Sequence, residues 1–300
     1  MSADVRPKPR AMVLAAGLGT RLLPLSAELP KPLMPVGDRP LLAHLAARLS
    51  RAGFASFAIN IHYLPEEFTS YYNKLESIPL VIQEPEIRGT AGGVAGARGS
   101  LGDAPILVWN GDVLVDPPVA ALFAAVGEGL AFAVAPRPLG VGTVGLDERG
   151  AVVRLRGERF GVEAFGGDYV GVAAIGARVL EQLPARGCLV GDVALPLLRA
   201  GERIPTVPLH GDWIDIGSVG AYRRANSEWL EHRGGAGASW VSASATVDPG
   251  VTLVASIVGD GAVVRGSGEM ARTIVWPGAH AVAPLSDAIV TTSGRVVTPS

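Results

Sequence analysis

The chain is poor in cysteine and in long apolar runs. Cys188 is its single cysteine among 300 residues, which excludes an intrachain disulfide framework and a metal site built from several cysteines. No apolar run reaches the roughly 18 residues of a membrane-spanning helix. The N-terminal stretch MSADVRPKPR is basic and no apolar segment follows it, so it lacks the pattern of a secretory signal. We expect a soluble, cytoplasmic protein in which residues 1–9 form a disordered leader.

The chain also has no large excess of basic or acidic residues. The chain has 26 basic and 28 acidic residues, a formal net charge of −2. This balance provides no electrostatic footprint for nucleic acid or for an anionic membrane. The five histidines follow no ligand spacing, so a zinc site is not expected. Since 48% of the residues are hydrophobic, the chain can bury a substantial core.

Apolar runs and helical patterns alternate over the first 112 residues. This alternation favours a parallel sheet with helices on both faces, and ligands of such sheets bind beyond the carboxyl ends of the strands. From about residue 130 the pattern changes: a hairpin turns at DERG, a further strand and helix follow, and a short strand, a turn and a helix end the segment. The expected strands are 11–17, 57–63, 78–84, 104–112 and 169–176, and the expected helices are 40–54, 65–76, 90–102 and 177–184.

The helical pattern disappears beyond the glycine-rich stretch 234–239, which we interpret as a linker. Ile257, Ile274 and Ile289 begin similar apolar triplets at intervals of 17 and 15 residues. Such spacing is typical of hexapeptide-type coils of a parallel β-helix. The alternative is a meander of loose antiparallel strands.

The stretch AAGLGTRLLPLSAELPKPL, residues 15–33, carries one of the three lysines of the chain. A glycine turn after a first strand presents backbone N–H groups to an anion. The dinucleotide fingerprint requires a third glycine where Leu22 stands, and the P-loop requires Gly-Lys-Ser/Thr, which is missing. What remains is a turn with Arg21 near it and Lys31 held between two prolines, two cations suited to phosphate oxygens.

Residues 17–32 resemble the signature of the sugar-1-phosphate nucleotidyltransferases, written G-x-G-T-R-L-x-P-L-T-x-x-x-P-K-P, with Ser26 in place of threonine. Three later stretches resemble further segments of the family: EPEIRGTAGGV its second nucleotide-contacting segment, VWNGDVL its metal-binding Gly-Asp, and WIDIGS its second aspartate motif. An appended β-helix is common in the family, particularly in relatives of GDP-mannose pyrophosphorylase, the mannose-1-phosphate guanylyltransferase. The resemblance therefore covers nearly the whole chain.

The resemblance implies an α/β fold: a Rossmann-like nucleotidyltransferase domain with a mostly parallel mixed sheet over 10–233, and a short left-handed β-helix over 240–300. The implied reaction joins a nucleoside triphosphate to a sugar 1-phosphate and releases pyrophosphate. Its attacking oxygen is already anionic, so no activated nucleophile is required, and none of the usual signatures is found. Catalysis would come from positioning and charge neutralisation.

The implied catalytic residues are Arg21, Lys31 and Asp112. Mg²⁺ prefers one or two carboxylates together with phosphate oxygens and waters, and Asp112 and Asp215 are the carboxylates that the family match selects. From its local pattern alone, Asn-Gly-Asp at 110–112 is equally good turn chemistry. The implied nucleotide-binding residues are Ala15, Ala16, Gly17, Gly19, Thr20, Arg21, Gln83, Gly89 and Thr90.

The sugar side departs from the family. Gly142 matches the hairpin glycine of a Tyr-Gly motif, but Val141 replaces the tyrosine. The common Glu-Lys-Pro sugar motif falls where this chain has RGER, residues 156–159, so Glu158 is either a substitute or surface charge. Gly142, Asp168 and Gly171 are the expected sugar contacts.

The favoured substrates are GTP and mannose 1-phosphate. UTP or dTTP with a glucose- or amino-sugar 1-phosphate is the alternative within the class. A catalytically silent regulatory subunit that binds nucleotide sugars is the alternative from another class. The expected partners are the small-molecule substrates and further copies of the chain, assembled through the β-helix.

Overall fold

The computed structural model describes residues 8–72 and 79–298. They form two compact units. The first comprises the residues up to Gly17 and Leu45–Trp213, and the second comprises Leu18–His44 and Ile214–Ser300. The stretch that contains Arg21 and Lys31 thus groups with the C-terminal part of the chain. The division into a domain over 10–233, a linker over 234–239 and a β-helix over 240–300 stays a prediction.

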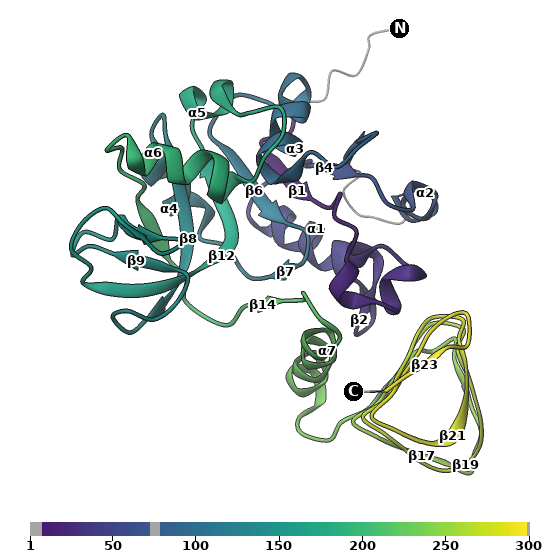
Figure 1. Ribbon diagram of the computed structural model, residues 1–300. Helices are drawn as coiled ribbons and strands as arrows, with labels where there is room; N and C mark the ends of the chain where they lie inside the picture. Colours follow the sequence, from purple (N-terminus) through teal and green to yellow (C-terminus); the bar gives the residue numbers. More distant parts are fainter. Residues whose placement is uncertain (1–7, 73–78, 299–300) are drawn as a thin grey trace, which may run out of the picture. The chain divides into compact units, whose positions relative to one another are not determined.

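The first unit is built on a mixed sheet whose strand order is β11-β10-β9-β12-β6-β1-β4-β5 (Figure 1). Strands β6, β1, β4 and β5 are mutually parallel, β12 is antiparallel to β6, and β8 pairs with β12 and β13. The strands are β1 (Ala11–Leu14), β4 (Ala58–Ile61), β5 (Leu80–Gln83), β6 (Ile106–Asn110), β7 (Val113–Leu114), β8 (Leu130–Arg137), β9 (Val144–Leu146), β10 (Val152–Leu155), β11 (Glu158–Arg159), β12 (Phe165–Ile175) and β13 (Thr206–Pro208).

The helices of this unit lie between the strands along the chain, for example after β4, β5, β7 and β12. They are α2 (Pro65–Tyr72), α3 (Gly89–Ala97), η4 (Arg98–Ser100), α4 (Val119–Val126), α5 (Ala177–Gln182), the π-helical segment η5 (Leu189–Ala194) and α6 (Leu195–Arg199). Helix α1 (Leu41–Arg51) begins in the second unit and continues into the first. The predicted mixed sheet is confirmed, and so is the hairpin that turns at residues 147–150. The predicted helix 65–76 is seen up to Tyr72; the rest lies outside the described residues.

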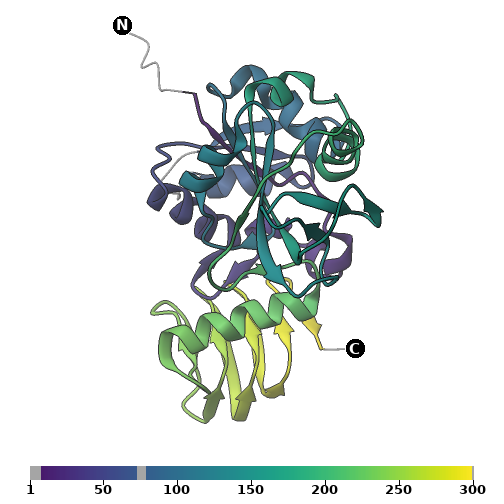
Figure 2. The ribbon, with the colours of Figure 1, turned by 90° about the vertical axis from the view of Figure 1, so that its left-hand side faces the viewer.

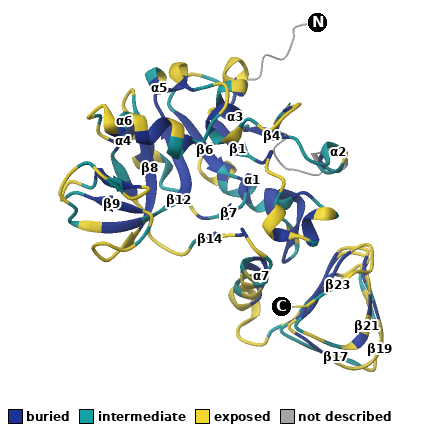
Figure 3. Cartoon of the chain, in the orientation of Figure 1, coloured by how far each residue is buried: buried dark blue, intermediate teal, exposed yellow. Residues whose placement is uncertain are grey.

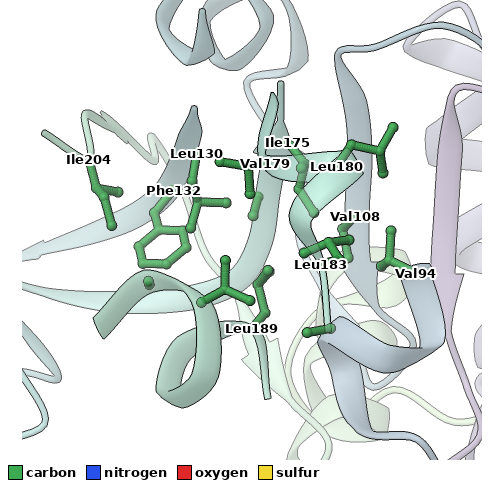
Figure 4. Packing of buried hydrophobic residues seen from close by; sticks show 14 of the residues in the cluster. Val94, Val108, Leu130, Phe132, Ile175, Val179, Leu180, Leu183, Leu189 and Ile204 are labelled. Carbon is green, nitrogen blue, oxygen red and sulfur yellow. The ribbon is translucent and has the colours of Figure 1, made fainter. Parts of the chain in front are cut away.

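The core of the first unit lies between one face of the sheet and the helices α3, α5 and α6. Figure 4 shows Val108 of β6 near Val94 of α3 and Ile175 of β12 near Leu180 of α5, with Phe132 of β8 farther along the same cluster. All five side chains are 7% exposed or less. The central strands are buried on both faces, which explains their continuous apolar sequence (Figure 3). Lys8 and Pro9 already contact this unit, because Lys8 Nζ donates to Gly99 O and Pro9 O accepts from Gly102 N.

The second unit combines a compact loop, a long helix and a β-helix. Its elements before the β-helix are η1 (Thr20–Leu22), η2 (Leu25–Ala27), η3 (Lys31–Leu33), β2 (Pro35–Val36), β3 (Arg39–Pro40), β14 (Ile214–Asp215) and α7 (Val219–Gly234). Leu22 and Leu25 are fully buried and anchor the loop. Ser218 caps α7, since its Oγ accepts from Ala221 N at 3.2 Å.

The C-terminal strands form a triangular stack of parallel coils, seen end-on in Figure 1 and from the side in Figure 2. Ile257 pairs with Ile274 and Ile274 with Ile289, which confirms the register predicted from the triplets. Among the described residues from Trp240 onward, antiparallel pairing is found in the hairpin of β22 and β23 alone, so the meander alternative is wrong. The strands are β15 (Trp240–Val241), β16 (Thr246–Val247), β17 (Val251–Val254), β18 (Ile257–Val258), β19 (Val263–Ala271), β20 (Ile274–Val275), β21 (His280–Ser286), β22 (Ile289–Val290) and β23 (Val296–Val297).

One corner of the β-helix repeats an unusual backbone conformation. Ala255, Arg272 and Asp287 have φ angles of 46°, 47° and 53°, in the left-handed region that non-glycine residues seldom adopt. Each stands two residues before one of the triplet isoleucines, so the same corner recurs from coil to coil.

Candidate active site

A pocket opens at the carboxyl ends of β1 and β6 in the first unit. Its volume is about 210 Å³, below the roughly 300–1,000 Å³ of a whole small-molecule site, so it suits part of a nucleotide. It is lined by Leu14, Ala16, Gly17, Asn60, Ile87, Gly89, Thr90, Asn110 and Asp112. Five of the predicted site residues therefore line one pocket: Ala16, Gly17, Gly89, Thr90 and Asp112. Ala15 is buried and is not among the lining residues.

Two buried polar side chains hold the walls of this pocket. Asn60 is 2% exposed and Glu84 is 3% exposed. Asn60 Oδ1 accepts from Ala15 N at 2.9 Å, and Asn60 Nδ2 donates to Glu84 Oε1 at 2.9 Å. Glu84 Oε2 in turn accepts from Arg88 N at 3.2 Å. These hydrogen bonds link the segment after β1 to the segment before α3.

Asn60 and Glu84 were not predicted as site residues. The signal for Asn60 is a polar residue inside the otherwise apolar strand AINI. Burial of such a group requires hydrogen-bond partners, but the sequence does not say which partners they are. Glu84 follows β5 and precedes a proline, which alone indicates a solvated turn.

The glycine at the start of α3 permits a close backbone approach. Gly89 has φ +77°, and a Cβ on it would lie 2.5 Å from Gly187 O. Gly187 O accepts from Ala91 N at 2.9 Å, and Thr90 Oγ1 accepts from Leu189 N at 2.7 Å. The segment 187–189 therefore secures the start of α3, and the Thr90 hydroxyl is engaged in this contact.

The predicted residues Asp112 and Gln83 differ in their placement, and so does the neighbouring Asp116. Asp112 is half-buried and follows β6 at the pocket. Gln83 is the exposed last residue of β5 and does not line the pocket. Asp116, four residues after Asp112, pairs with Arg51 at 3.1 Å and Arg48 at 3.3 Å on the surface.

The predicted sugar contacts fall into two places in the first unit. Gly142 has φ +91° and packs against the backbone of β12: a Cβ on it would lie 2.3 Å from Gly167 O and 3.1 Å from Asp168 Oδ1. Asp168 accepts from Arg137 Nε at 2.7 Å and from Thr143 N at 3.1 Å. Gly171 instead lies next to the pocket residue Asn110, since a Cβ on it would be 2.7 Å from Asn110 Nδ2.

Glu158, at the position of the Glu-Lys-Pro motif, forms a surface ion pair. Its two carboxylate oxygens accept from Arg199 Nε at 2.9 Å and Arg199 Nη2 at 2.5 Å. Because this pair holds the Glu158 carboxylate, the lowered pKa of Glu158 has its main cause in the Arg199 hydrogen bonds. The contact supports the surface-charge interpretation of Glu158.

The second unit contains the remaining predicted residues. Thr20 and Arg21 are exposed in η1, and Lys31 is half-buried at the start of η3. Gly19 has φ +65° and turns the loop so that a Cβ on it would lie 3.9 Å from Lys31 Cβ. A Cβ on Gly217 would lie 2.9 Å from Asp215 Oδ1 and 3.0 Å from Arg21 Nη2. The structure therefore brings the Arg21 guanidinium and the Asp215 carboxylate together around Gly217.

The predicted magnesium ligands, Asp112 and Asp215, belong to different units. Among the described residues there is no cluster of three or more His, Cys, Asp or Glu side chains that could bind a metal alone. Each of the two aspartates lies near glycine in its own unit, Asp112 directly after Gly111 and Asp215 two residues before Gly217. A single carboxylate of this kind suits Mg²⁺, which is commonly held by one or two carboxylates plus phosphate oxygens.

Within the part of the chain that the structure describes, no helix has the length and apolar character needed to cross a membrane.

Comparison with curated proteins finds several sugar-phosphate enzymes. A probable mannose-1-phosphate guanylyltransferase of Oryza sativa is 29% identical over 227 residues, covering 71% of this chain and 62% of that protein. A second, from Arabidopsis thaliana, is 30% identical over 230 residues, with 71% and 63% covered. The mannose-1-phosphate guanylyltransferase of Mycobacterium tuberculosis is 36% identical over 115 residues, covering 37% of this chain and 32% of that protein. The chain spans a little over three-fifths of the length of the two plant relatives.

Solved structures share the fold. HddC from Yersinia pseudotuberculosis superposes with a TM-score of 0.62 at 21% identity, covering 73% of this chain and 98% of that chain. An apo UDP-glucose pyrophosphorylase superposes with a TM-score of 0.60 at 18% identity, with 75% and 99% covered. The sequence profile of the nucleotidyl transferase family matches residues 10–232, which is more than half of the chain. The chain therefore belongs to the nucleotidyl transferase family.

Proposed function

We propose that the protein is a sugar-1-phosphate nucleotidyltransferase that takes GTP and mannose 1-phosphate and releases pyrophosphate. The observation that carries this proposal is the pocket at the ends of β1 and β6. Ala16–Gly17, Gly89–Thr90 and Asp112 line this pocket together. Backbone groups suit a nucleotide, and a carboxylate beside them suits a phosphate-bound cation.

In the proposed reaction, an anionic phosphate oxygen of the sugar 1-phosphate attacks the α-phosphorus of the nucleotide. The bond from the α-phosphorus to the oxygen that bridges to the β-phosphate breaks, and pyrophosphate leaves with that oxygen. The attacking group needs no base, so the residues of the chain act by orienting two polyanions and neutralising their charge. We assign charge neutralisation to Arg21, whose guanidinium matches phosphate oxygens, and to Lys31.

Asp112 and Asp215 would hold Mg²⁺, which would supply charge neutralisation at the phosphates when bound. Ala15, Ala16, Gly17, Gly19, Thr20, Gln83, Gly89 and Thr90 remain the proposed nucleotide contacts. Gly142, Asp168 and Gly171 remain the proposed sugar contacts.

The relatives named as mannose-1-phosphate guanylyltransferases support GTP and mannose 1-phosphate. A structure of HddC with GMP-PN further shows this fold with a guanine nucleotide. The second candidate is a UTP- or dTTP-dependent enzyme acting on a glucose- or amino-sugar 1-phosphate. It is favoured by the surface pairing of Glu158 at the sugar motif, which removes a family sugar contact.

The test is pyrophosphate release with Mg²⁺ across five nucleoside triphosphates and a panel of sugar 1-phosphates. We expect release with GTP and mannose 1-phosphate and loss of at least about 100-fold in kcat for Asp112→Ala, because electrostatic stabilisation of the transition state is the main source of rate here. Asp116→Ala is the matched control, since that nearby aspartate is paired on the surface.

Release with UTP or dTTP and a glucose- or amino-sugar 1-phosphate would support the second candidate instead. No release from any pair, by a folded protein that still binds a nucleotide sugar, would instead indicate a regulatory subunit. Assembly of several copies through the β-helix is a separate proposal, and sedimentation of the full chain tests it: a monomer would contradict it.

A further inference from the structure

Glu28 occupies a variable position of the signature stretch, seven residues after Arg21 and three before Lys31. It closes η2, since Glu28 N donates to Leu25 O at 3.1 Å. Two residues further on, Pro30 leads into η3, where Leu33 N donates to Pro30 O at 2.8 Å. The side chain of Glu28 is 16% exposed. Its carboxylate is therefore a rigid, largely covered part of the loop that carries Lys31.

A turn of the β-helix binds this carboxylate. Thr291 Oγ1 donates to Glu28 Oε1 at 2.6 Å, and Ser293 Oγ donates to the same oxygen at 2.7 Å. Ser293 N donates to Oε2 at 3.2 Å, and Arg295 Nε lies 3.9 Å from Oε1. We call residues 291–295 the carboxylate cradle. Hydrogen bonds to an ionised acceptor are the strong kind, so this contact holds the Glu28 side chain in place.

The cradle is itself fixed. Gly294 N donates to Thr291 O and Thr291 N donates to Arg295 O, both at 2.9 Å. Thr291 is fully buried, and β22 immediately before it belongs to the parallel stack. The donors therefore have their positions set by the β-helix rather than by Glu28.

A second attachment lies on the other side of Lys31. Trp276 Nε1, from the β-helix, donates to Tyr222 Oη on α7 at 2.9 Å. Tyr222 Oη donates to Pro35 O at 2.5 Å, and Asn226 Oδ1 accepts from Gly37 N at 2.9 Å. Figure 2 shows α7 running across the coils of the β-helix. The loop is thus held at Glu28 and again at 35–37, with Lys31 between the two attachments.

We infer that the β-helix positions the signature loop for catalysis within the same chain, and that Glu28 is the positioning residue through which it does so. This inference rests on the proposed function, because the group being positioned is the Lys31 ammonium. Glu28 touches no reacting atom in this scheme. The cradle fixes the backbone three residues before Lys31 and so fixes where its charge is presented.

The experiment compares Glu28→Ala and the double variant Thr291→Val/Ser293→Ala with the wild-type full chain. Pyrophosphate release gives kcat and KM, and hydrogen–deuterium exchange of the peptide 18–36 reports loop order. We expect kcat to fall about 10- to 100-fold, since a displacement of about 1 Å in a catalytic group can cost about 100-fold. KM for the nucleoside triphosphate should rise by a smaller factor than kcat falls, because Ala16–Gly17 and Gly89–Thr90 of the proposed nucleotide contacts lie in the first unit.

Two further variants separate positioning from general damage. Glu28→Gln keeps an oxygen for the two hydroxyls and should recover most of kcat. Asp248→Ala removes a matched carboxylate inside the β-helix, which accepts from Arg265 Nη1 and Gly266 N at 2.9 Å each. It should leave both kcat and the exchange of peptide 18–36 unchanged.

Faster exchange of peptide 18–36 together with a kcat loss in Glu28→Ala and in the double variant, without either change in Asp248→Ala, supports the inference. Unchanged exchange in a folded Glu28→Ala variant overturns it, as does an equal kcat loss in Asp248→Ala. If the wild type releases no pyrophosphate at all, the proposed function fails. The exchange measurement then still decides whether the cradle orders the loop.

Discussion

Replacing Asn60 tests how the pocket walls are held. Asn60→Ala removes the acceptor of the buried Ala15 N–H and the donor to the Glu84 carboxylate. A buried donor left without a partner costs about 1–3 kcal/mol, and a hydrogen bond to a charged group contributes about 1.5–3 kcal/mol. We therefore expect the free energy of unfolding to fall by about 3–5 kcal/mol, a large part of the roughly 5–15 kcal/mol of a native protein.

The same variant should weaken nucleotide binding, because the Ala15 backbone and the chain before α3 lose their common anchor. Asn60→Asp separates the two contributions: it keeps an acceptor for Ala15 N but turns the donor to Glu84 into a repelling carboxylate. Urea unfolding measures the stability of both variants, and titration calorimetry measures their affinity for the nucleoside triphosphate. A stability loss below about 1 kcal/mol in Asn60→Ala would refute the network, and unchanged affinity despite a large loss would refute its role in the pocket.

Three other predictions concern single contacts. Gly89→Ala should lower nucleotide affinity at least about tenfold, as measured by calorimetry, because its Cβ would meet Gly187 O at 2.5 Å in a backbone of φ +77°; unchanged affinity would contradict this. Tyr222→Phe should lower the free energy of unfolding in urea by about 3 kcal/mol, since it leaves the Trp276 indole N–H and the Pro35 carbonyl without their partner. A decrease under about 1 kcal/mol would contradict this prediction. Burial raises the pKa of Glu28, but the hydrogen bonds it accepts lower the pKa by more, below 4.5. Its contribution to stability should therefore be complete above pH 4.5 and be lost as pH falls through the lowered pKa, so acid unfolding of Glu28→Gln should be less steep than that of the wild type.

The elements that could be predicted were those with a clear hydrophobic periodicity or with glycine or proline at their ends. The triplets at Ile257, Ile274 and Ile289 even predicted the register of the β-helix, because a stack of coils places equivalent residues side by side. Helix α4 and strand β8 were not predicted. The first reads VAALFAAV and the second LAFAVAPR, and a continuous apolar run does not distinguish a buried helix from a buried strand.

The site divides in a similar way. The glycine turn could be located from the sequence, because a glycine after a strand marks where a sheet opens to a ligand. Asp112 was selected by the family resemblance, since its local pattern is equally good turn chemistry. Asn60 and Glu84 could not be located in this way, since their role depends on a hydrogen bond between two residues that are 24 positions apart in the sequence. Nor does the sequence show that the loop carrying Lys31 rests on residues 291–295, which lie over 250 positions away.

The recurring left-handed corner of the β-helix bears on how the protein could be made more robust. Ala255, with φ 46°, adopts a conformation that costs an L-residue about 1–2 kcal/mol. Asparagine tolerates this region better than alanine and loses less unfolded-state freedom than glycine would. Ala255→Asn should therefore raise the melting temperature of the β-helix by a few degrees. Because this corner recurs in successive coils, backbone strain is present at equivalent positions, and each position can be substituted separately.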